Sequence, residues 1–418
     1  MPQPSKRLQP RSYGAFRCVG ADCEDTCCIG WGVNIDRPTY EAYQGSDDPE
    51  LGPLLRELVT INTANTSDDN YAKIAITSTG CPFLSDGWCS IQKKLGESYL
   101  SKMCATYPRV MSTVDDVLYR SLHLSCPEAA RLVLLDSSPM EFEEAPFADD
   151  GSRIGNLSML STKSEKFKDK PYSSFPEVRS FVISLLQNRN YALWKRLVML
   201  AAFCDQLNDA RDATPVVSGH RDAVGGGLFD ESLNQLQPRP VAQFEIVVEL
   251  IVGRIGSDYT SPRFLECYRQ FMQGLEWTQE STMTELGSRY EAAYTKYCGP
   301  FMAQHEYILE NYLVNSAHGK LFPFGPQEGT QNLNFERVVN TISKQYLLLA
   351  VYFAVIKTML IGVAGFHKAD FCIDHVLKVV QCCAKTFEHS LAFPEKALEI
   401  LAGHGIKNCV SLATLLRN

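Results

Sequence analysis

Cysteine is concentrated at one end of this 418-residue chain, and that concentration constrains the fold and chemistry more than any other feature. The stretch FRCVGADCEDTCCIGW, which begins at residue 16, holds four cysteines within eleven positions. Of the fifteen cysteines, eight precede residue 127, and these are Cys18, Cys23, Cys27, Cys28, Cys81, Cys89, Cys104 and Cys126. Thiols gathered in this way serve as disulfides, as a redox pair or as ligands of a metal centre.

The cellular compartment helps to decide between these uses, because disulfides persist mainly in oxidising compartments. The first residues, MPQPSKRLQPRSYG, contain no apolar run that would act as a signal peptide, so we expect a cytoplasmic protein whose thiols stay reduced. Disulfides are therefore disfavoured. The net charge of −8 also argues against a general nucleic-acid binder, which normally carries a basic face.

One apolar stretch, residues 347–366, is long enough to cross a lipid bilayer. Lys357 lies at its middle, where a charge is costly in lipid, and no aromatic and basic flanks bracket the stretch. We therefore predict a buried core helix and no membrane span.

Composition and periodicity divide the chain into three regions. Residues 1–135 are rich in Gly, Pro, Asp and Thr, whereas residues 136–175 are acidic and then rich in Ser and Lys, which is typical of a linker or mobile loop. In residues 176–418 apolar side chains recur at spacings of three and four, which predicts helices. The predicted fold class is mainly α, with an irregular cysteine-rich metal-binding N-terminal module and a helical C-terminal domain. Within the module, short helices are predicted at 37–45, 50–60 and 90–103, and a strand at 71–77.

The spacing of the thiols favours a metal centre. The first block reads C-x4-C-x3-C-C, a C-x7-C pair follows, and two single cysteines come later. Thiolates are the soft ligands that zinc and iron–sulfur clusters prefer, and four of them suffice for either. Because eight exceed four, the surplus could hold a second centre or pack as small apolar side chains. Unligated structural cysteines also stay open as an alternative.

Four sequence blocks carry a resemblance. FRCVGADCEDTCCIGW, CPFLSDGWCSIQKKLGE, CATYPRV and SLHLSCPEAARLVL together resemble the flagellin lysine N-methylase family over residues 13–135. The resemblance extends more weakly into YLVNSAHGKLFPFG, at 312–325. It implies methyl transfer from S-adenosylmethionine to surface lysine ε-amines of flagellin, and an iron–sulfur cluster, with 4Fe-4S the expected type. The alternative function is a non-catalytic zinc- or iron-chelating or redox-sensing protein, with zinc as the alternative metal.

The choice of ligands among the eight cysteines follows from their separation. Adjacent Cys27 and Cys28 are not expected both to bind one iron site, and Cys126 ranks lowest because its surroundings read as a buried loop entering a helix. His123 is a substitute ligand by its position. The favoured set, drawn from separate blocks, is Cys23, Cys27, Cys81 and either Cys89 or Cys104.

Methylation of lysine by direct displacement needs a neutral amine and a lining that stabilises cations. The predicted catalytic residues are Tyr107, Asp25 and Glu128, and the predicted cofactor-binding residues are Trp31 and Arg109. A structural role stays open for each of them. The chain has neither the strand and Gly-rich turn of nucleotide-binding methyltransferases nor the C-x3-C-x2-C pattern of radical enzymes. The donor site and the choice between polar and radical mechanisms are therefore open.

Overall fold

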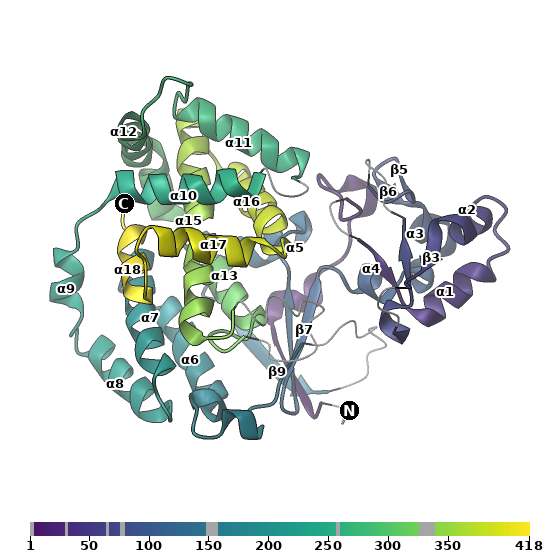
Figure 1. Cartoon of the computed structure of the whole chain (residues 1–418), viewed down its shortest axis with the longest axis horizontal. Coiled ribbons are helices and arrows are strands. Elements are labelled where there is room, and N and C mark those ends of the chain that lie inside the picture. Colours follow the sequence, from purple (N-terminus) through teal and green to yellow (C-terminus); the bar gives the residue numbers. More distant parts are fainter. Residues whose placement is uncertain are drawn as a thin grey trace.

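The computed structural model describes residues 4–29, 32–63, 67–75, 80–147, 158–255, 260–325 and 339–418. Trp31 lies outside these residues. A small lobe with the first four helices stands at one end of the molecule, a sheet lies in the middle, and the remaining helices form the other end (Figure 1). The chain is mainly helical, as predicted.

The strands are short and lie in the first 160 residues. They are β1 Lys6–Pro10, β2 Asn34–Ile35, β3 Val59–Ile61, β4 Ala72–Ile74, β5 Leu84–Ser85, β6 Trp88–Cys89, β7 Arg109–Val114, β8 Val117–Leu122, β9 Phe142–Pro146 and β10 Ser158–Leu160. The α-helices of the first 135 residues are α1 Arg37–Gln44, α2 Leu51–Leu58, α3 Ser90–Leu95, α4 Lys102–Thr106 and α5 Pro127–Leu134.

The later helices are longer. They are α6 Phe175–Leu186, α7 Leu193–Asn208, α8 Thr214–Gly225, α9 Asp230–Gln235, α10 Pro240–Ile255, α11 Pro262–Gly274, α12 Met283–Ala293, α13 Gly299–Gly319, α15 Ile342–His367, α16 Ile373–Cys383, α17 Phe393–Gly403 and α18 Cys409–Ala413. Two wider π-helical turns, Tyr294–Cys298 and Ala384–Glu388, join α12 to α13 and extend α16.

Local sequence explains the small elements. Asp36 caps α1 by accepting from the Thr39 backbone N–H, and its second carboxylate oxygen accepts from the Lys102 N–H at the start of α4. The short helices predicted at 37–45 and 50–60 are confirmed as α1 and α2. Of the strand predicted at 71–77, residues 72–74 form β4, and residues 76 and 77 lie outside the described ranges. The single helix predicted at 90–103 is wrong, because Gly96 adopts a φ of +87° that ends α3 before α4 begins.

The central sheet joins segments that are far apart in sequence. Its strand order is β10-β7-β8-β1-β9, with β1 parallel to β8 and antiparallel to β9. Strands β7 and β8 form an antiparallel hairpin that pairs Arg109 with Leu122. The segment 136–175, predicted to be a linker or mobile loop, contributes β9 and β10, while residues 148–157 lie outside the described ranges.

The molecule has two hydrophobic cores, and each of them takes side chains from the first 135 residues. The small core is built from side chains between Val33 and Leu100. The large core takes Tyr13, Phe16, the β7–β8 hairpin and α5 together with the C-terminal helices. The first 135 residues are therefore shared between the two cores, and α5 packs against α13 and α16 of the helical region.

Helix α15 runs through the large core. Within the described ranges it belongs to the one helical segment long and apolar enough to cross a membrane, and 94% of the most apolar window of that segment is buried inside the protein. The predicted core helix is thus present. Helix α11 approaches α15 so closely that a Cβ added to Gly274 would lie 1.9 Å from the Gly362 carbonyl oxygen. The Lys357 ammonium donates to the Leu416 carbonyl.

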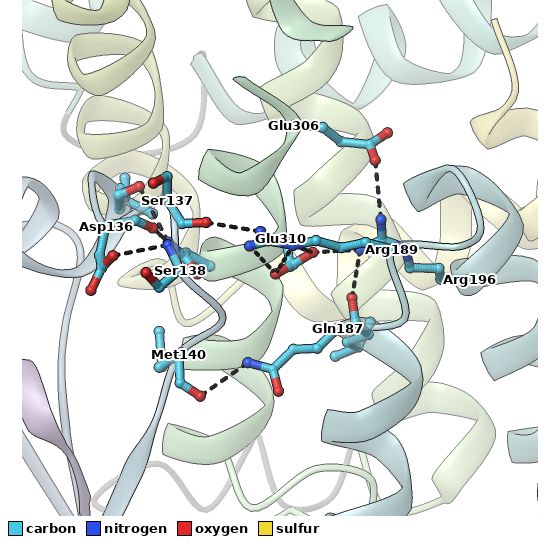
Figure 2. Close-up of polar contacts among 12 residues, drawn as sticks. Asp136, Ser137, Ser138, Met140, Gln187, Arg189, Arg196, Glu306 and Glu310 are labelled. Carbon is cyan, nitrogen blue, oxygen red and sulfur yellow. Dashed lines mark hydrogen bonds and ion pairs between the residues drawn. The ribbon is translucent and has the colours of Figure 1, made fainter. Parts of the chain in front are cut away.

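A buried ion-pair network fixes the region where α6, α7 and α13 meet (Figure 2). Glu310 of α13 has a side chain that is 1% exposed, and its Oε2 accepts from Arg196 Nη1 at 2.6 Å. Arg189 binds the same carboxylate from the α6–α7 loop at 2.8 Å and also donates to the Ser137 carbonyl. The network therefore attaches the segment after α5 to the helical region.

Candidate functional site: a cysteine-lined cavity between the two cores

Seven of the eight N-terminal cysteines line one cavity of about 180 Å³. Its walls come from the loop that carries the first block, from β6, from α4 and from the start of α5. Cys81, the eighth cysteine, is buried in the small core. Tyr107, Asp25, Glu128 and Arg109 also line the cavity. The sequence blocks that carry the resemblance in residues 13–135 are thus brought to one place.

The thiols fall on two sides of this cavity. Cys28 shares side-chain hydrogen bonds with Cys27 and Cys89, and the Cys81 backbone N–H donates to the Cys28 carbonyl at 2.9 Å. Cys104 lies on the same side, against the small core. The structure therefore places Cys28, rather than the favoured Cys23, beside Cys81 and Cys89.

The other side of the cavity carries Cys18, Cys23 and Cys126. The Cys23 thiol donates to the Asp25 carbonyl at 2.9 Å, and Cys126 is the N-cap residue of α5. Cys126, which ranked lowest by sequence, does precede a helix as expected, but it also faces the cavity. No set of four is singled out by these contacts.

Burial and mutual contact favour the thiol form of Cys28, Cys104 and Cys126. The hydrogen bond with Cys27 and burial raise the pKa of Cys28 to about 12. Burial raises the pKa of Cys104 to about 12 and that of Cys126 to about 11. Metal binding would therefore release protons. Within the described part of the chain, no three His, Cys, Asp or Glu side chains are arranged as a formed metal site.

A buried cluster behind Tyr107 was not predicted. The Tyr107 hydroxyl lies 2.9 Å from Ser125 Oγ, which in turn lies 2.8 Å from both His123 Nδ1 and His389 Nε2. The two imidazoles stack with ring centroids 4.3 Å apart, and burial lowers the pKa of both. His123, suggested as a substitute ligand, thus contacts Ser125. Sequence spacing could reveal neither Ser125 nor His389, because 264 residues separate them.

Asp25 anchors the cysteine loop to the helical region. Its Oδ1 accepts from Lys385 Nζ at 2.9 Å and its Oδ2 from Gln381 Nε2 at 2.8 Å. Lys385 also donates to the Thr26 carbonyl, and Gln381 to the Ser125 carbonyl. Lys385 and Asp25 are each 11% exposed. We call these contacts the Asp25 anchor. Both carboxylate oxygens are engaged, so Asp25 positions the wall of the cavity.

Charged groups of both signs face the cavity. Glu128, in the first turn of α5, accepts from Arg131 Nη1 at 3.1 Å, and Arg131 also pairs with Glu24. The Arg109 guanidinium lies 5.1 Å from the centroid of the Phe16 ring. The predicted catalytic carboxylate Glu128 therefore lies at the cavity wall with Arg131 as its hydrogen-bond partner, and Arg109 brings a positive charge to the same cavity.

This architecture defines a class of protein in which a helical domain holds a cysteine-rich loop that lines a cavity. Residues 179–415 match the family model of the FliB lysine N-methylase C-terminal domain. The chain therefore belongs to the FliB lysine N-methylase family. The resemblance predicted from the N-terminal blocks is confirmed, and the family match covers the helical region where the blocks gave only 312–325.

Individual relatives agree with this assignment. The chain is 25% identical over 252 residues to a Lysine-N-methylase of Salmonella typhimurium strain LT2. This alignment covers 58% of this chain and 59% of that protein. It is 31% identical over 137 residues to the Flagellar biosynthetic protein FliU of Salmonella muenchen, covering 32% of this chain and 81% of that one. The match thus spans well under two thirds of the methylase. No solved structure matches the chain.

Proposed function

We propose that this protein transfers methyl groups to lysine ε-amines of a flagellar protein, flagellin, in the cytoplasm. S-Adenosylmethionine is the proposed donor, and the cysteine cavity is the proposed site of an iron–sulfur cluster of the 4Fe-4S type. The names of the relatives, Lysine-N-methylase and Flagellar biosynthetic protein FliU, support methylation in a flagellar context. The observation that carries the proposal is the cavity where seven of the eight N-terminal cysteines meet Asp25, Tyr107 and Glu128, with its cysteine loop held by the family's own domain through the Asp25 anchor.

The donor set fits a soft metal centre. The small-core side of the cavity offers Cys27, Cys28, Cys89 and Cys104, and Cys81, buried in the small core, is a fifth thiol, so that four separate segments contribute. Four sulfurs are enough for a cluster or for zinc. When bound, a cluster supplies an iron centre and one-electron chemistry next to the substrates. The Asp25 anchor holds the loop that carries two of the five thiols.

The remaining cavity residues suit a cationic substrate pair. Glu128 provides a carboxylate near the positive charge of an ammonium or a sulfonium, and the Trp88 ring provides an aromatic face. Trp88 is held against Gly20, where a Cβ would come within 3.2 Å of its ring. Tyr107 presents its hydroxyl edge to the Ser125 cluster, which fixes the orientation of its ring at the wall. In this proposal Glu128, Trp88 and Tyr107 bind and orient the lysine and the methyl donor, whereas the cysteines hold the cluster.

The test uses the full chain purified without oxygen, with iron, sulfide and zinc measured per chain. Incubation with flagellin and methyl-labelled S-adenosylmethionine should place label on flagellin lysines, located by mass spectrometry of peptides. Glu128→Gln should lower turnover while the iron content stays at the wild-type value. An iron-loaded protein that leaves flagellin unlabelled refutes the methylase proposal. A zinc-loaded, colourless and inactive protein would instead support the metal-chelating alternative.

A further inference from the structure

A second cavity, of about 210 Å³, lies behind the β7–β8 hairpin and takes no part in the function proposed so far. Part of its wall is the block YLVNSAHGKLFPFG, which the resemblance singled out without giving it a role. The residues of that block that line it are Ser316, Gly319, Lys320 and Phe322. Helix α15 contributes Leu348, Leu349 and Tyr352, and the π-helical turn after α16 contributes Glu388.

A buried carboxylate is the chemical centre of this cavity. The Glu388 side chain is 7% exposed, and its Oε2 accepts from Lys320 Nζ at 2.7 Å. Its Oε1 accepts from the Tyr312 hydroxyl at 2.8 Å. The Lys320 ammonium also lies 4.6 Å from the centroid of the Tyr352 ring. A cation is thus held by a carboxylate and an aromatic face, with leucine and phenylalanine side chains around it.

The ammonium between Glu388 and Tyr352 belongs to Lys320, whose side chain is able to leave the cavity. Lys320 is the C-cap residue of α13, and its side chain is 36% exposed, in contrast to the buried Glu388 and Tyr352. The stem of a lysine is long and flexible, and its ammonium is readily hydrated. Rotation of Lys320 into solvent would therefore leave the carboxylate and ring in place and enlarge the cavity for another alkylammonium group.

This cavity is separate from the cysteine cavity. His123 and Ser125 lie between Glu388 and Tyr107, which is part of the wall of the cysteine cavity. The His123 Nε2 atom is 3.9 Å from Glu388 Oε2. His389 stacks on His123 and closes the same partition. A side chain bound at Glu388 therefore does not reach the thiols.

We propose that this second cavity binds a lysine side chain of the protein substrate, which takes the place of Lys320 against Glu388 and Tyr352. The exchange replaces one ammonium by another, so no covalent bond or net charge changes. A lysine held here docks the substrate while a different lysine enters the cysteine cavity, a role that rests on the proposed function. Lys320 acts as an internal competitor that sets how tightly the docking lysine binds.

Binding of n-butylammonium, which has the length of a lysine stem, tests the site without any methyl transfer. In Lys320→Met the competitor is gone, and we expect the dissociation constant, measured by calorimetry, to fall at least about tenfold below that of the wild type, since an attached competitor acts at high effective concentration. The melting temperature of Lys320→Met should rise with n-butylammonium. Equal affinity in the two proteins, or an equal effect of neutral n-butanol, would overturn the proposal.

Further variants assign the contacts. Adding Glu388→Gln to Lys320→Met should abolish binding, and adding Tyr352→Leu should weaken it severalfold through loss of the ring face. Lys320→Gln serves as the competitor-free protein should Lys320→Met fail to fold. Nα-acetyl-lysine amide should bind as n-butylammonium does. Tight binding of S-methylmethionine, a sulfonium, without binding of the lysine amide would assign the cavity to the methyl donor and reject the docking role.

Failure of this inference and failure of the proposed function give different results. A wild-type protein that methylates flagellin but whose Lys320→Met variant binds no n-butylammonium loses the docking site only. A protein that binds the amine but never labels flagellin loses the methylase function only. Where both hold, Lys320→Met should lower KM for flagellin more than KM for a peptide with one lysine, and adding Tyr352→Leu to Lys320→Met should raise KM for flagellin again.

Discussion

The ion-pair network around Glu310 allows a sharp prediction about the stability of the helical region (Figure 2). Glu310→Gln keeps the shape of the side chain and removes its charge. Arg196, whose side chain is 2% exposed, then remains buried without its closest carboxylate partner. Its guanidinium keeps the Leu186 and Tyr191 carbonyls as acceptors, and Glu306 at 3.2 Å.

The size of the effect follows from these distances. Removal of one partner from a buried ion pair costs about 3–5 kcal/mol, because the other charge loses its compensation. Arg189 is 40% exposed, so water screens much of its interaction with Glu310. Glu306 still neutralises part of the Arg196 charge. We therefore expect the lower end, a loss of about 3 kcal/mol in the free energy of unfolding.

The matched control is Glu306→Gln. Glu306 also pairs with Arg196, but its side chain is 39% exposed, so we expect a loss of about 1 kcal/mol or less. Urea unfolding followed by circular dichroism and by tryptophan fluorescence measures both variants. The double variant Arg196→Met/Glu310→Met removes both charges and should recover part of the loss. Equal losses in Glu310→Gln and Glu306→Gln, or a loss below about 1 kcal/mol in the former, would refute the reasoning.

Three further predictions concern the site and the sheet. Cys28→Ser should lose bound iron and its visible absorption after anaerobic purification, whereas Cys298→Ser, buried outside the cavity, should keep both. Asp25→Asn weakens the Asp25 anchor and should speed hydrogen exchange of the first cysteine block about tenfold, with exposed Asp22→Asn as the unchanged control. Burial, with Arg179 nearby, lowers the pKa of His318 from 6.5 to about 3, so below pH 6.5 the unfolded state takes up a proton that the folded state does not. Wild-type stability should therefore fall by up to about 1.4 kcal/mol more per pH unit than that of His318→Gln on acidification from pH 6.5 towards 3, and parallel pH profiles would contradict this assignment.

Much of the local structure was predictable because the sequence patterns that determine it lie within a few neighbouring residues. A short helix was predicted at 37–45, where Asp36 caps α1, and the long apolar stretch 347–366 with Lys357 at its middle predicted the core helix α15. The gathering of the cysteine blocks was predictable as well, because several cysteines at short spacings favour a common centre. The helix at 90–103 failed because one residue, Gly96, takes a left-handed backbone conformation that periodicity ignores.

The rest of the site depends on contacts across the whole chain. Gln381 and Lys385 hold Asp25, and His389 holds Ser125, through hydrogen bonds that join the last helices to the first cysteine block. No spacing rule connects such residues, since the sheet and α5 must first bring the two ends together. The division of residues 1–135 between two cores was hidden for the same reason: β1 pairs with β9 across more than a hundred residues.

During synthesis, the first cysteine block leaves the ribosome early and its anchor leaves late, because Lys385 follows Asp25 by 360 residues. A nascent chain therefore carries its thiols on a loop that lacks the contacts fixing it to the helical region. Iron delivered at that stage would meet thiols in many arrangements, and oxidants would meet them unprotected. For the proposed cluster, the order of the chain would thus favour insertion after translation, once the protein has folded around the cysteine cavity.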